Sequence, residues 1–302
     1  MSTVRIGVDL GGTKIEVIAL DDTGQTLVRQ RVATPQGDYA ATLRAVVDLV
    51  TGIERQLGVR GSVGVGSPGA LSPATGVIKN ANSTCLNGKP LDRDLAVALG
   101  RAVRVANDAD CFALSEATDG AATDAPIVFG VILGTGVGGG IVAQGRLLAG
   151  PNAIAGEWGH NPLPWPQADE LPGQPCYCGK TGCIETWLSG PGLAADHFRV
   201  TSHLLTAHEI AQQAAQGDDV QCVATVQRYE ARLARALASV INILDPHVIV
   251  LGGGLSNMSS LYEGVPRIWG RHVFSDHVHT RLVPALHGDS SGVRGTAWLG
   301  ST

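Results

Sequence analysis

One histidine and three cysteines have a spacing that suits a metal ion. His160 precedes Cys176, Cys178 and Cys183 in the pattern H-x15-C-x-C-x4-C. One ring nitrogen and three thiolates form a complete ligand set for tetrahedral zinc, and the turn at Gly179–Gly182 lets the last cysteine return toward the pair. Two other interpretations remain, namely buried thiols or a Cys-x-Cys pair with redox chemistry. The spacing predicts a structural zinc site.

Two carboxylates flank these ligands without being needed by the metal. Glu157 lies three residues before His160, and Glu185 lies two residues after Cys183. A zinc ion that joins the two segments would hold both carboxylates and the second nitrogen of His160 in fixed positions. Such an array of hydrogen-bonding groups suits a polyhydroxylated ligand. The other cysteines are scattered, and we expect them to be ordinary core residues: Cys85, Cys111 and Cys222.

Glycine-rich turns follow two predicted strands. Residues Asp9–Lys14 have the sequence DLGGTK, and Gly134–Gly140 have the sequence GTGVGGG. In such turns the backbone N–H groups can face phosphate oxygens, because no side chain keeps an anion away. The first turn is not a Walker loop, which needs G-x4-G-K-[ST] before a helix. Either turn alone could be a plain hairpin, but the pair predicts a nucleoside triphosphate held from two halves of the chain.

Several residues in or near these turns have assignable roles. Asp9 is placed to hold a hydrated Mg²⁺ ion, and Thr135 offers a hydroxyl donor. Lys14 could neutralise a phosphate or point to solvent from a hairpin strand. Gly253 and Gly254 follow a buried-looking strand, where they either line an adenine pocket or allow tight packing against a helix.

Asn107 and Asp108 end another predicted strand and precede a helical pattern. A kinase needs a carboxylate within hydrogen-bond reach of the acceptor hydroxyl, so Asp108 is the candidate general base. The alternative is that Asp108 caps the following helix. Both roles are compatible, because the positive end of a helix keeps a carboxylate ionised.

The hydrophobic pattern alternates between strand and helix periods, as in α/β proteins. The predicted strands are residues 4–10, 15–20, 27–32, 63–66, 103–106, 127–133, 141–143 and 248–251, and the predicted helices are 39–57, 108 to about 120, 220–244 and one beginning near 290. The order strand, glycine turn, strand at residues 4–20 returns at 127–143. This repetition predicts an internal duplication whose two halves face each other across a cleft.

Composition and charge exclude several function classes. The 302 residues are 44% hydrophobic and 16% charged, which is ordinary for a globular protein of two domains. A net charge of −5 without a basic run argues against a nucleic-acid partner. We find neither a signal-peptide core nor an apolar run of membrane-spanning length, so we expect no membrane partner and a cytoplasmic location, which suits reduced cysteines.

Two polar stretches are set aside as candidate sites. His272, Asp276, His277 and His279 fit no common ligand pattern, so a surface loop is predicted there. Asp289–Ser291 is typical of a helix cap.

Five motifs together resemble the ROK family of bacterial sugar kinases. They are Asp9–Lys14, VANDA at 105–109, Gly134–Gly140, GEWGH at 156–160 and CYCGKTGCIE at 176–185. Within the family, KNANST at 79–84, GHNPLPW at 159–165 and HGDSSGVRG at 287–295 look most like the bacterial manno(fructo)kinases.

The resemblance implies a fold and a division of the chain. The fold is α/β and actin-like (ribonuclease H-like), duplicated into two domains with a central cleft and a structural zinc site. The N-terminal domain would comprise residues 1–117 and take back the C-terminal helix, 290–302. The larger domain, 118–289, would hold the zinc. Homodimers are usual in the family, so we expect one here.

The resemblance also implies residue roles. The sugar hydroxyls would be bound by Asn82, Asn107, Asp108, Glu157, His160 and Glu185, with Asp108 as the base. His160 would bind zinc through one nitrogen and sugar through the other. The phosphates and Mg²⁺ would lie at Asp9, Gly11, Gly12, Thr13, Lys14, Thr135, Gly136 and Gly138, and the adenosine near Gly253 and Gly254.

From this resemblance we expect an ATP- and Mg²⁺-dependent enzyme that phosphorylates D-fructose on its 6-hydroxyl to give D-fructose 6-phosphate. Mannose, glucose and an N-acetylhexosamine are alternative substrates, because a site that binds shared hydroxyls tolerates related sugars. A non-catalytic sugar-binding or regulatory protein of the same family is a further alternative. A regulator would need a helix-turn-helix segment before the first glycine turn, and a non-catalytic binder would have a damaged base or phosphate turn.

Overall fold

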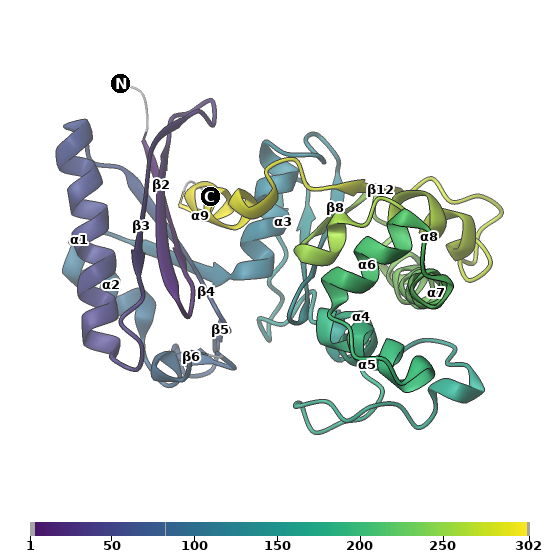
Figure 1. Cartoon of the computed structure of the whole chain (residues 1–302). Coiled ribbons are helices and arrows are strands. Elements are labelled where there is room, and N and C mark those ends of the chain that lie inside the picture. Colours follow the sequence, from purple (N-terminus) through teal and green to yellow (C-terminus); the bar gives the residue numbers. More distant parts are fainter. Residues whose placement is uncertain (1–3, 82, 301–302) are drawn as a thin grey trace. The chain divides into compact units, whose positions relative to one another are not determined.

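The computed structural model describes residues 4–81 and 83–300, with the backbone alone for Asp289, and contains two five-stranded sheets of identical strand order (Figure 1). The first sheet has the order β3-β2-β1-β4-β7 and the second β10-β9-β8-β11-β12. In each sheet an antiparallel three-stranded meander precedes two strands that run parallel to its first strand. This common topology confirms the predicted duplication.

The strand positions agree closely with the hydrophobic pattern. The strands of the first sheet are β1 Arg5–Leu10, β2 Lys14–Leu20, β3 Thr26–Ala33, β4 Ser62–Ser67 and β7 Val103–Asn107. Those of the second are β8 Ile127–Leu133, β9 Val137–Ala143, β10 Arg146–Leu147, β11 Val248–Gly252 and β12 Arg281–Pro284, and a small pair comprises β5 Ala70–Leu71 and β6 Ile78–Lys79. The edge strands β10 and β12 were not predicted, because they are too short to show a period of two.

The helices include the four that the sequence predicts. They are α1 Tyr39–Leu57, α2 Leu91–Leu99, α3 Asp108–Thr118, α4 Glu185–Leu188, α5 Gly190–Thr201, α6 Ala207–Gln216, α7 Val220–Leu244, α8 Leu261–Trp269 and α9 Ser291–Leu299. Short 3₁₀ helices occur at η1 Thr84–Leu86, η2 Trp158–His160, η3 Ala168–Glu170, η4 Gly254–Asn257 and η5 Gly288–Ser290. The carboxylate of Asp38 accepts the N–H of Ala41 and caps α1, as its position before the helical pattern predicts.

The chain forms two compact units. The first comprises Met1–Asp124, Gly140–Ala155 and Leu286–Thr302, and the second comprises Ala125–Gly139 and Gly156–Ala285. The first unit thus contains residues 118–124, 140–155 and 286–289, which the sequence-based division places in the larger domain. Residues 140–155 belong there because Gly140 lies directly on α3, where an added Cβ would come within 2.6 Å of the Ala109 carbonyl oxygen. The sequence-based domain boundaries stay a prediction, and the units of the structure are used below.

The first sheet is covered on both faces. Helices α1 and α2 pack on one face, whereas α9 packs on the other beside α3 (Figure 1). Helix α9 approaches its neighbours closely at glycines. A Cβ on Gly295 would lie 1.7 Å from the carbonyl oxygen of Cys111 in α3, and a Cβ on Gly64 would lie 2.0 Å from that of Thr296. The C-terminal helix is therefore an integral part of the first unit's core.

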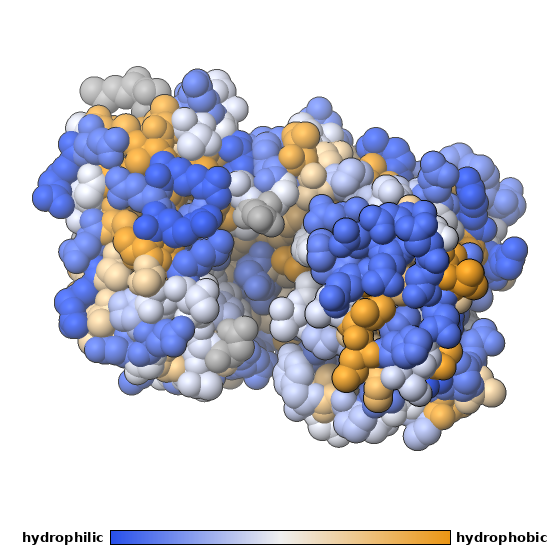
Figure 2. Space-filling view, in the orientation of Figure 1, coloured by the Kyte–Doolittle hydropathy of each residue, from blue (hydrophilic) through white to orange (hydrophobic). Residues whose placement is uncertain are grey.

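The surface in view is mainly hydrophilic, and its hydrophobic residues occur in separate groups (Figure 2). None of the helices in the described part of the chain combines the length and apolar character that a membrane span requires.

We predict that Gly295→Ala lowers the free energy of unfolding by at least about 2 kcal/mol, because the new methyl group has no room against Cys111. Chemical denaturation measures this change. Gly292→Ala on the same helix is the matched control, since a Cβ there meets nothing within 4 Å and alanine favours the helix by up to about 1 kcal/mol. Equal effects of the two substitutions would contradict the close packing of α9 on α3.

Candidate functional site

The first glycine turn joins β1 to β2 and is braced from β3. Within it the Gly11 N–H donates to the Lys14 carbonyl oxygen at 3.0 Å. Thr34, just after β3, holds the turn through its hydroxyl on the Gly11 carbonyl at 2.7 Å and its N–H on the Thr13 carbonyl at 3.0 Å. Gly12 and Thr13 at the tip are exposed. The turn is thus rigid and accessible, as a phosphate-binding turn must be.

Lys14 belongs to a cluster of charges beside this turn. Its ammonium lies 3.9 Å from Glu16 Oε2, and Glu16 also binds Arg29 and Arg31. Glu16 is buried at 2% exposure, whereas the side chain of Lys14 is half exposed. The sequence left open whether Lys14 neutralises a phosphate or points to solvent. In the structure its side chain lies in this ion cluster and is partly exposed to solvent.

Two carboxylates, Asp9 and Asp108, lie close together in the first unit. Burial, together with the negative charge of Asp108, raises the pKa of Asp9 to about 6. Burial likewise raises the pKa of Asp108. Two desolvated carboxylates that repel each other favour a divalent cation or a transferable proton between them.

The helix cap at this point is Asn107, not Asp108. Asn107 Oδ1 accepts the N–H groups of Ala109 at 2.7 Å and Asp110 at 3.3 Å. Asp108 is the first residue of α3, and its Oδ1 also accepts the Ala109 N–H, at 2.8 Å. The alternative that Asp108 is the cap is therefore wrong, because the side chain one residue earlier already reaches the free N–H groups of the helix.

The predicted metal ligands gather at one place in the second unit. The Nδ1 of His160 and the three Sγ atoms of Cys176, Cys178 and Cys183 all lie within 4.8 Å of one another. Nδ1 is 3.6 Å from Cys176 Sγ, and the Sγ atoms of Cys178 and Cys183 are 3.6 Å apart. Zn–S bonds of about 2.3 Å in a tetrahedron place sulfurs about 3.8 Å apart. The cluster therefore fits zinc in both donor set and size.

The second nitrogen of His160, expected to bind sugar, has a partner that the sequence did not indicate. Its Nε2 lies 3.0 Å from the hydroxyl of Tyr177, and the two rings meet edge to face at 5.1 Å. The Tyr177 side chain is 84% exposed. Although the residue as a whole is exposed, partial desolvation of its hydroxyl raises the pKa of Tyr177 to about 12, together with the negative charges of Glu185, Cys176 and Glu157. Of the groups expected to bind sugar in this unit, His160 thus contacts this phenol, and Glu185 and Glu157 act on it through their charge.

The sequence feature that could have indicated Tyr177 is its position between the ligands Cys176 and Cys178. A residue between two metal ligands lies close to the metal site. Glu185 has an equally unexpected contact, because its Oε2 accepts the N–H of Val137 in the second glycine turn at 2.9 Å.

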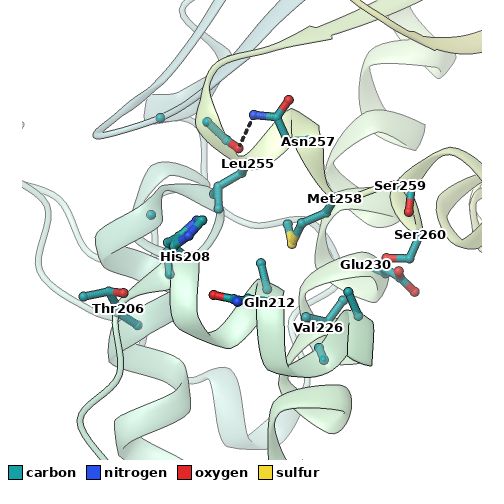
Figure 3. A pocket seen from close by; sticks show the side chains of 18 of the residues that line it. Thr206, His208, Gln212, Val226, Glu230, Leu255, Asn257, Met258, Ser259 and Ser260 are labelled. Atoms are coloured by element: carbon teal, nitrogen blue, oxygen red, sulfur yellow. Dashed lines mark hydrogen bonds between the residues drawn. The ribbon is translucent and has the colours of Figure 1, made fainter. Parts of the chain in front are cut away.

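A cavity of about 1360 Å³ opens next to this second turn, within the second unit (Figure 3). It is lined by Gly134 and Thr135 of the turn, by Thr206, His208 and Gln212 at α6, by Val226 and Glu230 of α7, and by Gly254, Leu255, Asn257 and Met258 at η4. Its volume and mixed lining suit a nucleotide. The structure thus brings Thr135 and Gly254 to one pocket, and helices α6 and α7 supply walls that the sequence did not indicate.

The two glycines after β11 have different environments. Gly253 has a φ of +81°, and a Cβ there would lie 2.5 Å from the Leu133 carbonyl oxygen. Gly253 is therefore required by tight packing and does not line the cavity. Gly254 lines the cavity, and a Cβ there would meet nothing within 4 Å.

The candidate residues are divided between the two units. The first unit carries Asp9, Gly11, Gly12, Thr13, Lys14, Asn107 and Asp108, and the second carries Thr135, Gly136, Gly138, Glu157, His160, Cys176, Cys178, Cys183, Glu185, Gly253 and Gly254. Asn82 lies outside the described residues.

The predicted helix cap at Asp289–Ser291 is wrong, because Ser290 precedes α9 without a side-chain cap hydrogen bond and the Ser291 hydroxyl donates to Glu116 instead. In the other stretch that was set aside, His272 is half-buried and stacks on Trp165. Asp276, His277 and His279 are exposed, and the structure groups metal-ligating side chains only at His160 and the three cysteines, within its described residues. Cys111 and Cys222 are buried and Cys85 is half-buried.

We predict that Cys178→Ser lowers the zinc content of the purified protein well below the roughly one ion per chain expected of the wild type, because a serine hydroxyl is a poor substitute for a thiolate. Elemental analysis by mass spectrometry measures the content. Cys85→Ser is the control, since Cys85 is outside the cluster. An equal loss in both variants, or a wild type without zinc, would contradict the assignment.

Comparisons with known proteins show the family to which the chain belongs. The ROK family model matches residues 5–302. The N-acetyl-D-glucosamine kinase of Yersinia pseudotuberculosis serotype O:1b (strain IP 31758) is 41% identical over 297 residues, covering 97% of each chain. A crystal structure of the ROK hexokinase from Thermus thermophilus is 32% identical with a TM-score of 0.86, covering 99% of this chain and 97% of that one. The ROK family glucokinase from Streptomyces griseus, in complex with glucose and AMPPNP, is 27% identical with a TM-score of 0.76 and 99% coverage of both chains. The chain therefore belongs to the ROK family of sugar kinases and has its actin-like, ribonuclease H-like α/β fold.

Proposed function

We propose that this protein transfers the γ-phosphate of ATP to the 6-hydroxyl of a hexose, with D-fructose as the preferred acceptor. The observation that carries the proposal is a cavity large enough for a nucleotide that reaches Thr135 in a glycine turn, together with a metal-ligand cluster whose histidine has its second nitrogen on a hydroxyl partner and whose following segment contacts the same turn through Glu185. One part suits a nucleotide and the other suits hydroxyl groups.

In this proposal Asp108 accepts the proton of the attacking hydroxyl. Its burial raises its pKa, so it binds a proton more readily than an exposed aspartate does near neutral pH. The position at the first turn of α3 still favours the ionised form between turnovers. Asp9, with its pKa of about 6, would hold the Mg²⁺ that accompanies ATP. Mg²⁺, when bound, neutralises charge on the phosphates.

The metal-ligand cluster has a positioning role in the proposal. His160, Cys176, Cys178 and Cys183 would hold zinc, which supplies a fixed anchor rather than a reactive group. With Nδ1 on the metal, the imidazole keeps Nε2 for a hydroxyl partner. Tyr177 has that place in this structure, and a sugar hydroxyl would replace the phenol.

Two observations favour different acceptors. D-fructose is supported by the segments 79–84, 159–165 and 287–295, whose resemblance to manno(fructo)kinases includes the residues directly after His160. N-Acetyl-D-glucosamine is the second candidate, because relatives with that name are 41% identical over almost the whole chain. The two sugars differ at the carbons that would face shared hydrogen-bonding groups, so relative rates distinguish them.

The test measures ADP release with ATP–Mg²⁺ and one sugar at a time: fructose, mannose, glucose, N-acetylglucosamine or N-acetylmannosamine. Each sugar is used at concentrations from well below to well above its KM. We expect the highest kcat/KM for fructose. A higher kcat/KM for N-acetylglucosamine would make that sugar the preferred acceptor and leave the proposed phosphate transfer unchanged. If none of the sugars stimulates ADP release, the proposed reaction is wrong.

We predict that Asp108→Asn retains sugar binding but loses at least about a hundredfold in kcat, the usual scale for removal of a general base. Calorimetry measures sugar affinity, and coupled ADP release measures kcat. The neighbouring Asp110→Asn should keep most of its turnover, because the proposal gives that carboxylate no chemical role. Near-normal turnover of Asp108→Asn would exclude Asp108 as the base.

We also predict that Gly254→Val weakens ATP binding at least about tenfold with little change in thermal stability, since the side chain would enter the cavity and meet no protein atom nearby. Gly253→Ala should instead lower the melting temperature, because it would clash with Leu133 at a positive φ. Fluorescence-based nucleotide titration and calorimetric melting separate the two. Unchanged nucleotide affinity in Gly254→Val would place the adenosine elsewhere.

A further inference from the structure

The second glycine turn is held from outside by residues of the metal-binding region. Its internal bond joins the Gly134 N–H to the Gly136 carbonyl at 3.0 Å. The next N–H, of Val137, donates to Glu185 Oε2 at 2.9 Å. A Cβ on Gly136 would lie 2.7 Å from the same oxygen, so the carboxylate lies directly against the turn.

The segment that carries Glu185 holds the turn at both ends. Five residues after Glu185, the Gly190 N–H donates to the Gly134 carbonyl at 2.8 Å. The short helix α4 begins with Glu185, two residues after Cys183, and ends two residues before Gly190. A displacement of Cys183 would therefore be transmitted along a few residues to both ends of the glycine turn.

The segment that carries His160 contacts β9, the strand in which the second glycine turn continues. The Trp158 indole N–H donates to the Gly138 carbonyl at 3.0 Å, and a Cβ on Gly159 would lie 2.3 Å from the Val137 carbonyl oxygen. The two ligand-bearing segments are joined to each other by the Ile184 N–H on the Asn161 carbonyl at 2.8 Å. The glycine turn and the start of β9 therefore lie between the segments that a metal ion would cross-link.

A carboxylate beside a phosphate-binding turn repels the phosphates. Its presence there therefore calls for a structural contribution that offsets this repulsion. Here one oxygen of Glu185 is bound to a backbone N–H, a charge-assisted bond that fixes the orientation of the turn. Fixing it in advance removes an ordering cost from nucleotide binding.

We infer that Glu185 is a positioning residue that couples the metal-ligand cluster to the second glycine turn, so that metal occupancy controls nucleotide affinity even without sugar. This inference rests on the proposed binding of ATP phosphates at that turn. It gives Glu185 a purpose apart from contact with sugar hydroxyls.

The experiment is calorimetric titration of the full-length protein with AMPPNP–Mg²⁺ in the absence of sugar. Glu185→Ala should weaken nucleotide binding at least about fivefold, as expected for loss of a hydrogen bond to a charged group. Glu185→Gln should restore affinity to within about twofold of the wild type, because its amide oxygen can still accept the Val137 N–H. Asp169→Ala is the matched control, since Asp169 is an exposed carboxylate of the same metal-binding region without a contact to the turn, and it should bind the nucleotide normally.

A second arm tests the metal. Cys178→Ser should lose metal and bind AMPPNP more weakly, with zinc content and affinity measured on the same sample. If Glu185→Ala does not fold, this variant alone tests the inference. Unchanged nucleotide affinity in Glu185→Ala or in zinc-depleted Cys178→Ser would overturn the inference. A wild type that does not bind AMPPNP at all would instead refute the proposed function, so the two failures are distinguishable.

Discussion

The loop between His160 and Cys176 carries one short 3₁₀ helix, η3, so buried charges on α7 must hold it in place. Arg235 of α7 binds both oxygens of Glu170, at 2.9 and 2.7 Å, and also donates to the carbonyl oxygens of Pro164 and Trp165. Arg232, one turn earlier, binds Glu170 at 2.8 Å and Asp196 of α5 at 3.0 Å. This anchor fixes the loop that connects the histidine to the first two cysteines, whereas the last cysteine is joined to the histidine segment by the backbone bond between Ile184 and Asn161.

The buried part of this network pairs the guanidiniums of Arg232 and Arg235 with the carboxylates of Glu170 and Asp196, and each of these four side chains is at most 4% exposed. Asp196 also binds Arg199 and Arg228, whose side chains reach the solvent. Although burial acts to raise them, the arginine contacts lower the pKa values of Glu170 and Asp196 to about 2. Both carboxylates are therefore ionised near neutral pH, and their contribution to stability is lost only as the pH falls from about 4 toward 2. Trp187 covers Arg232 at 4.5 Å and keeps water from the network.

The two sheets show how one topology came to support two kinds of glycine turn. In the first unit the turn is braced from its own meander, by Thr34 after β3. In the second unit the equivalent strand is the short β10, and the turn is braced instead by Glu185 and Gly190 from the metal-binding region. The first turn thus has a local brace and the second a distant one, which links the second turn to the metal-ligand cluster.

The sequence by itself determined the α/β pattern, the duplication and the four metal ligands, because period, turn residues and ligand spacing are local properties that survive without knowledge of packing. It also singled out Asp9 and Asp108 as candidate site residues, since ligands in this fold class bind beyond the carboxyl ends of the strands. Only the tertiary structure decided that Tyr177 partners His160, that Glu185 binds Val137, and that Gly253 serves packing while Gly254 lines a cavity. These contacts depend on side-chain directions and on residues that are far apart in the chain. Such residues come together only when helices and loops pack, so no local sequence pattern predicts their contacts.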